Sequence, residues 1–144
     1  MAQAAIQPAD ITAASIASGP GSFTGLRISI SYLKGLLFGK DIPVYPLSSL
    51  ESAAATLPLS PLIEVLFDAR QGRAFHARFR VESGKVIRES EDTLIDAENF
   101  TPNPASLLVY DTCSNRLSPL PKGRGIDLAS LAINRAAALV TITD

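Results

Sequence analysis

Gly19-Pro20-Gly21-Ser22-Phe23-Thr24-Gly25-Leu26-Arg27 (GPGSFTGLR) is the stretch of this chain that decides the fold. The small and β-branched residues of 11–18 precede it and predict a buried strand, and the apolar pattern of 26–38 predicts a helix after it. Its glycines permit positive φ and close backbone approach, and Ser22 or Thr24 can cap the helix. Such a unit either cradles a phosphate at the helix N-terminus or packs a helix tightly onto a strand. Its spacing matches neither the P-loop nor the dinucleotide fingerprint, which favours the structural corner.

The rest of the chain predicts an α/β protein with a mixed sheet. Pro58 and Pro61 rule out a continuous helix, so we expect one unit over 1–58 and a second over 59–144. The alternation over 73–81 indicates a strand buried on one face only. The further expected elements are a strand over 44–47 interrupted by Pro46, a short helix to Thr56 capped by Ser48 or Ser49, strands over 62–67, 86–94 and 107–110, a connection over 114–125, and a helix over 128–139 capped by Asp127.

Composition excludes several classes of protein. The 144 residues are 47% hydrophobic and 19% charged, which indicates a packed core. Because 13 basic and 14 acidic residues give a net charge of −1 and no basic patch, we expect no strong binding to tRNA by this chain alone. The single cysteine, Cys113, fits a cytoplasmic location, and no apolar run is long enough to span a membrane.

No group of residues predicts catalysis or a metal site. His76 is the only histidine, so no zinc-peptidase motif can form. The GxSxG pattern of a serine hydrolase is also absent, because Gly21-Ser22-Phe23-Thr24-Gly25 has the wrong spacing. Cys113 has no activating base nearby in the sequence and is more consistent with an inert thiol. For Asp68, close to Arg70, we favour a turn carboxylate that accepts local backbone N–H groups over a functional polar pair.

The helix expected over 26–38 is apolar on more sides than one sheet can bury. Leu26, Ile30, Leu33 and Leu37 form one stripe at helical spacing, while other apolar side chains point elsewhere. Ser31 and Gly35 leave a shallow groove that permits close helix approach. Either a neighbouring helix of the same chain, a partner subunit or a second copy could cover this surface, and we favour a partner.

Several strings of this sequence resemble the TsaB (YeaZ) family, from about Asp10 to Arg80. They are GPGSFTGLR, Lys34-Gly35-Leu36, Ile42-Pro43-Val44, Ser48-Ser49-Leu50-Glu51 and Asp68-Ala69-Arg70-Gln71-Gly72. The resemblance implies an actin-like ATPase (ribonuclease H-like) fold of two related halves. The strands that open the family, which include an Asp-Thr-Ser motif, and its C-terminal tail are not found here. We therefore expect a truncated N-terminal half, an incomplete nucleotide site and an exposed strand edge that self-association would hide.

The resemblance also implies a function. Family members are non-catalytic scaffold or activating subunits that bind a catalytic TsaD-type paralogue, are joined by a TsaE-type ATPase, and support the transfer of threonylcarbamoyl to tRNA adenosine. We expect this chain to need no cofactor, with ATP or ADP bound only in the assembled complex, and to form a homodimer when alone. The expected partner-binding residues are Arg27, Ile28, Ser31, Tyr32, Lys34 and Gly35.

Two other functions remain open from the sequence. A nucleotide-binding module would use the loop made of Gly19, Pro20, Gly21, Ser22, Phe23, Thr24 and Gly25. Alternatively, the chain retains the fold but has lost its function.

Overall fold

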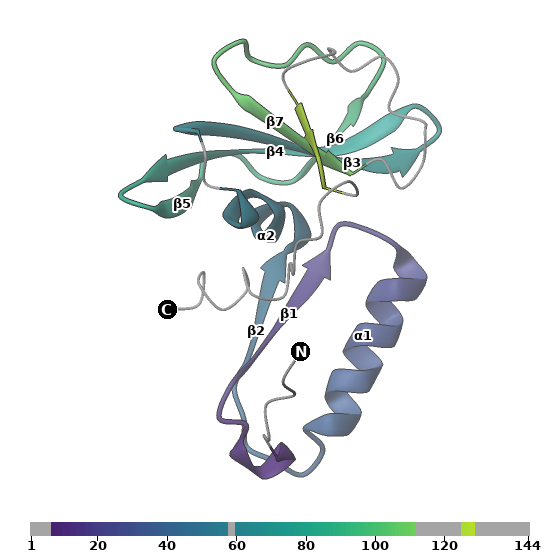
Figure 1. Ribbon diagram of the computed structural model, residues 1–144. Coiled ribbons are helices and arrows are strands. Elements are labelled where there is room, and N and C mark those ends of the chain that lie inside the picture. The colour runs from purple at the N-terminus through teal and green to yellow at the C-terminus, as the bar shows by residue number, and fades with distance from the viewer. Residues whose placement is uncertain (1–6, 58–59, 112–124, 129–144) are drawn as a thin grey trace.

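The computed structural model describes residues 7–57, 60–111 and 125–128. The described elements form a two-stranded and a six-stranded sheet, with α2 packed between them and α1 alongside the smaller one (Figure 1). In chain order they are the 3-10 helix η1 (Pro8–Asp10), β1 (Ala14–Gly19), α1 (Phe23–Leu36), β2 (Val44–Ser48), α2 (Ser49–Thr56), β3 (Leu62–Arg70), β4 (Arg73–Glu82), β5 (Lys85–Arg88), β6 (Thr93–Asp96), β7 (Leu107–Asp111) and β8 (Gly125–Asp127). None of the helices in these ranges is long and apolar enough to cross a bilayer.

The small sheet is a β–α–β unit. β1 and β2 pair in parallel, with Ala14 opposite Val44 and Ile16 opposite Pro46. Parallel strands need a crossover, which α1 provides. β2 runs through Pro46 instead of breaking there, because among the described strands it pairs only with β1 and a proline is tolerated on such an edge.

Helix α1 begins and ends earlier than its apolar pattern predicts. Ser22, not Thr24, is the N-cap, and its Oγ accepts a hydrogen bond of 3.3 Å from the Gly25 amide. The helix therefore starts at Phe23 and runs to Leu36, compared with the expected range of 26–38. Gly39, with φ +73°, turns the chain beyond the end of the helix. Between residues 11 and 49 no residue is buried, so this part of the molecule has little core of its own.

The main core lies between α2 and the large sheet. Ser48 caps α2 by accepting hydrogen bonds from the amides of Leu50 at 3.1 Å and Glu51 at 3.4 Å. Strand order in the large sheet is β5-β4-β3-β7-β8, with β3 antiparallel to β4 and parallel to β7. The fully buried side chains that meet here are Leu50, Ala53, Ala54, Val65, Ala77, Phe79 and Val109. Because α2 belongs to this core, the core contains side chains from both of the predicted units, 1–58 and 59–144. The division into two units stays a prediction.

The strand predicted over 86–94 is two strands, β5 and β6, that share one edge of β4. The break occurs where the amides of Glu89 and Ser90 both donate to the Arg78 carbonyl, at 2.9 and 3.3 Å. The Ser90 hydroxyl in turn accepts from the Arg78 amide at 2.9 Å. A serine side chain thus replaces a backbone acceptor, and the regular ladder ends.

Two further predictions about strands were wrong. β4 is buried on both faces at its start, since Ala74 packs with Leu66 and Leu108 in a second core under residues 97–100. Gly125, expected to end the connection, is instead the first residue of β8, which ends at Asp127, the residue expected to cap the next helix. The connection over 114–124, Cys113 and the helix predicted beyond Leu128 lie outside the described residues.

Candidate functional site

The glycine loop joins the end of β1 to the start of α1, but only one of its three glycines has a positive φ. Gly19 has φ +113°, and a Cβ there would lie 3.3 Å from Leu26 Cδ1, so glycine lets the helix approach the strand. The Gly19–Pro20 peptide is cis. A Cβ on Gly21 would meet nothing within 4 Å, and one on Gly25 would make an ordinary contact with Ser22. Of the loop glycines that permit positive φ, only Gly19 therefore uses it.

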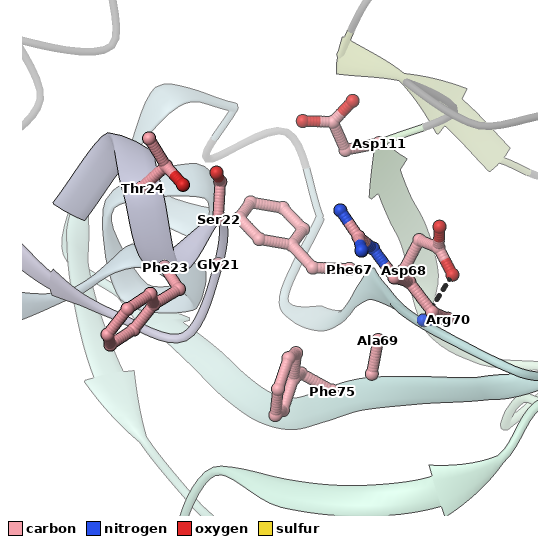
Figure 2. Close-up of a pocket in the computed structure, with 10 residues that line it drawn as sticks. All are labelled: Gly21, Ser22, Phe23, Thr24, Phe67, Asp68, Ala69, Arg70, Phe75 and Asp111. Atoms are coloured by element: carbon pink, nitrogen blue, oxygen red, sulfur yellow. Dashed lines mark hydrogen bonds between the residues drawn. The ribbon is translucent and has the colours of Figure 1, made fainter. Parts of the chain in front are cut away.

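A cleft of about 920 Å³ lies between this loop and the end of β3 (Figure 2). Its lining residues are Gly21, Ser22, Phe23, Thr24, Phe67, Asp68, Ala69, Arg70, Phe75 and Asp111. The carboxyl ends of the parallel strands β3 and β7 contribute the two aspartates, and such strand ends are where α/β proteins commonly bind ligands. The cleft thus joins the N-terminus of α1, three aromatic rings, one arginine and two carboxylates.

The turn after β3 holds Arg70 in an uncommon conformation. Arg70 and Gln71 have φ of +67° and +54°, values that are rare for residues other than glycine. Asp68 Oδ1 accepts a 2.8 Å hydrogen bond from the Arg70 amide, which confirms the prediction of a turn carboxylate. In Figure 2 the Arg70 guanidinium reaches into the cleft between Phe67 and Asp111.

The outer face of α1 is apolar and uncovered. We define this face by Ile28, Ser31, Tyr32 and Gly35, which recur three or four residues apart and are all exposed. Ile28 is 65% exposed and Tyr32 72%, and a Cβ on Gly35 would meet nothing within 4 Å. Phe23, 73% exposed, lies beneath the Arg27 guanidinium at 5.4 Å from ring centroid to Cζ. No residue of α1 is buried, which confirms that this helix exposes more apolar surface than the described chain covers.

The opposite stripe of α1 behaves largely as predicted. Leu26, Leu33 and Leu37 are half-buried toward the small sheet, and Ile30 is more exposed. The predicted partner residues Arg27 and Lys34 are both exposed on α1 beside the outer face. The structure thus gathers all six predicted partner residues on one helix, and the seven loop residues lie together at its N-terminal end.

Sequence reasoning missed a buried carboxylate on the far face of the large sheet. Glu64, the third residue of β3, is 3% exposed, and its Oε1 accepts hydrogen bonds from the Asn103 amide at 3.1 Å and the Ser106 hydroxyl at 3.0 Å. Its Oε2 lies 3.5 Å from His76 Nε2, which is buried with no closer polar partner among the described residues. A charged residue inside the apolar run of 62–67 was the available signal.

Opposing effects set the charge state of Glu64. Burial would raise the pKa of Glu64, but the neighbouring His76 and the hydrogen bonds from Asn103 and Ser106 outweigh burial and hold that pKa below its ordinary value of 4.5. The ionised carboxylate thereby anchors the segment 97–106 to the sheet. His76 faces this carboxylate and the Phe100 ring, 5.0 Å away between centroids. No group of three potential metal ligands occurs in the part of the chain that the structure describes.

A second polar cluster fastens α2 to the large sheet. Arg88 lies on β5, 3.1 Å from Glu51 on α2 and 2.7 Å from Asp92, with its guanidinium 5.0 Å from the Phe79 ring centroid. Asp92 also accepts a 2.8 Å hydrogen bond from the hydroxyl of Ser48, the N-cap of α2. This cluster therefore fastens α2 to the large sheet and does not line the cleft.

The described fold defines an α/β protein of the actin-like, ribonuclease H-like class. It is similar to the solved structure of YeaZ from Pseudomonas aeruginosa, with a TM-score of 0.76 and 22% identity over 96% of this chain and 67% of that one. The family model described as TsaD, tRNA N6-adenosine threonylcarbamoyltransferase, matches residues 1–134. The chain belongs to this family, and its relatives place it with the TsaB (YeaZ) members.

The curated relatives are considerably longer than this chain. A protein from Bacillus subtilis named tRNA threonylcarbamoyladenosine biosynthesis protein TsaB is 38% identical over 62% of this chain and 41% of its own length. The Escherichia coli protein of the same name is 34% identical over 62% of this chain and 40% of its own length. A Nitratidesulfovibrio vulgaris protein named tRNA N6-adenosine threonylcarbamoyltransferase is 30% identical over 87% of this chain and 33% of its own. The chain thus spans 33% to 41% of the length of these relatives.

Proposed function

We propose that this chain is a cytoplasmic, non-catalytic scaffold or activating subunit in the biosynthesis of threonylcarbamoyladenosine in tRNA. In this proposal it binds a TsaD-type catalytic protein through the outer face of α1, and a TsaE-type ATPase joins the complex. The relatives named as tRNA threonylcarbamoyladenosine biosynthesis proteins support the assignment to this pathway. The observation that carries the binding role is that α1 has no buried residue, while Ile28 and Tyr32 are 65% and 72% exposed.

Packing chemistry explains why a helix of another subunit would fit. Ile28 and Tyr32 provide apolar area on adjacent turns, and Gly35 lets a second backbone approach closely. Tyrosine is enriched at protein interfaces because its ring buries a large area while its hydroxyl finds a polar partner. Among the described residues the cleft is lined by no histidine or cysteine, so the hydroxyls of Ser22 and Thr24 have no histidine base there, which supports a non-catalytic role.

The binding role is tested by isothermal titration calorimetry with the TsaD-type protein from the same genome. Changing Gly35 to leucine should leave the fold intact, since a Cβ there meets nothing and leucine favours helix. We expect this variant to lose at least about tenfold in affinity, because the side chain fills the space that a partner helix needs. A matched control, Lys85→Leu on the exposed start of β5, should bind like the wild type. Equal affinity for Gly35→Leu and wild type would refute this interface.

The second candidate is nucleotide binding at the cleft. It is favoured by the position of the glycine loop and the N-terminus of α1 on one wall of a 920 Å³ space, with Arg70 reaching into it. The two aspartates weigh against a strongly anionic ligand. Calorimetry with ATP and ADP, with this chain alone and with the TsaD-type complex, separates the two functions. We expect heat of binding only in the assembled complex.

A further inference from the structure

The outer face of α1 carries charge of only one sign. Arg27 and Lys34 lie seven residues apart, which places them on one edge of this face, about 10 Å apart along the helix axis. Between Phe23 and Leu36 the helix contains no aspartate or glutamate. Within the described chain, no carboxylate lies at salt-bridge distance from either cation. An apolar stripe is therefore bordered on one edge by two positive charges that have no carboxylate partner among the described residues.

We propose that this face selects a helix of a different protein whose own apolar stripe is bordered by two carboxylates about two helical turns apart. The proposal rests on the proposed function and specifies the chemistry of the partner at that interface. Ile28, Tyr32 and Gly35 would pack against the apolar stripe, while Arg27 and Lys34 would meet the carboxylates at the rim. Charges at the rim of an interface contribute less to affinity than to the choice and orientation of the partner.

A second copy of this chain fits the face less well. If two copies of α1 pack antiparallel about a two-fold axis, residues at the same distance from the centre oppose each other, so Arg27 of one copy faces Lys34 of the other. If they pack in parallel, the cationic edges lie on opposite sides and neither meets a carboxylate of α1. Like charges juxtaposed across an interface disfavour a partner, so the charge pattern favours a heterologous helix over self-association.

Peptides test this inference without requiring the TsaD-type protein. Two synthetic amphipathic helices with the same apolar stripe would carry either two glutamates or two lysines seven positions apart on one edge. Fluorescence anisotropy would measure their binding to the full chain at low ionic strength. We expect the glutamate peptide to bind about tenfold more tightly, since two rim ion pairs replace two repulsions, and the difference to shrink as salt is added. Equal binding of the two peptides, or binding of neither, would overturn the inference.

Charge reversal on the protein provides the sharper comparison. The double variant Arg27→Glu with Lys34→Glu should prefer the lysine peptide, and circular dichroism would establish that it is folded. The milder Arg27→Gln with Lys34→Gln pair should abolish the preference while keeping the apolar face. Lys85→Glu, a reversal on β5, should leave the preference unchanged. If the double reversal keeps the preference for glutamate, the peptides bind elsewhere and the inference fails.

Binding measurements with the TsaD-type protein distinguish failure of the proposed function from failure of this inference. If the peptides discriminate as expected but the TsaD-type protein does not bind the wild-type chain, the charge inference holds and the proposed function fails. If the TsaD-type protein binds and its affinity is unchanged by the double reversal, the proposed function stands and the inference about its partner's charge fails.

Discussion

Replacing Glu64 with leucine removes the acceptor of two hydrogen bonds on the far face of the large sheet. Glu64 is 3% exposed, and its carboxylate accepts from the Asn103 amide at 3.1 Å and the Ser106 hydroxyl at 3.0 Å, with His76 at 3.5 Å. A buried donor left without its acceptor costs about 1–3 kcal/mol. The donors here are less buried than that, since Asn103 is exposed and Ser106 half-buried, and water can reach them as segment 97–106 loosens. The expected loss for the pair is therefore about 1–3 kcal/mol.

The sign of the pH dependence follows from the direction of the pKa shift. The pKa of Glu64 is held below its ordinary value of 4.5 in the folded chain, so the unfolded chain binds the proton first as pH falls. The stabilisation is complete above about pH 4.5 and is lost as the pH falls through the folded-state pKa. Glu64→Gln should be less stable than the wild type at neutral pH. As the pH falls, it should also lose less of its unfolding free energy than the wild type, because glutamine does not titrate.

Urea unfolding followed by circular dichroism at pH 7 and at pH 3.5 measures both effects. The matched control is Glu82→Gln on β4, an exposed carboxylate at 3.1 Å from Arg80, for which we expect a change within about 0.5 kcal/mol. A loss below about 0.5 kcal/mol for Glu64→Leu at unchanged m-value would refute the anchoring role. So would an unaltered pH profile for Glu64→Gln.

Four further substitutions test the packing, the loop geometry and a helix cap by the same unfolding assay. Leu50→Ala, at a fully buried position where α2 meets the large sheet, should lose about 2–5 kcal/mol, and a loss under about 1 kcal/mol would contradict that packing. Gly19→Ala should lose at least about 1 kcal/mol because φ is +113° there, whereas Gly21→Ala should be nearly neutral; equal effects would contradict the loop geometry. Ser48→Ala should lose about 1 kcal/mol through the N-cap of α2, and an unchanged midpoint would contradict the capping role.

Elements with strong local signals were predictable from the sequence. The glycine loop between a strand and a helix, the cap at Ser48 and the strand of 62–67 all follow from short-range preferences that the structure satisfies. The exposure of α1 was also predictable, since apolar residues on several sides of a helix exceed what one sheet can cover.

Features that depend on distant residues were not predictable in the same way. The break between β5 and β6 depends on the Ser90 hydroxyl reaching the Arg78 amide, a contact between different strands. The burial of Ala74 results from residues 97–100, which lie on the second face of the sheet. The Glu64 anchor likewise requires Asn103 and Ser106 to come within 3.1 Å of a carboxylate some forty positions earlier in the sequence.

Hydroxyl-radical footprinting of Tyr32 in the complex with a TsaD-type protein tests the outer face of α1 most directly. The chain has three tyrosines, and Tyr32 is 72% exposed, compared with 46% for Tyr45 on β2, which serves as an internal reference. We predict that oxidation of Tyr32 falls strongly when the complex forms, while oxidation of Tyr45 changes little. A complex that forms with Tyr32 oxidised at the rate of the free chain would contradict the assignment of this face as the partner surface.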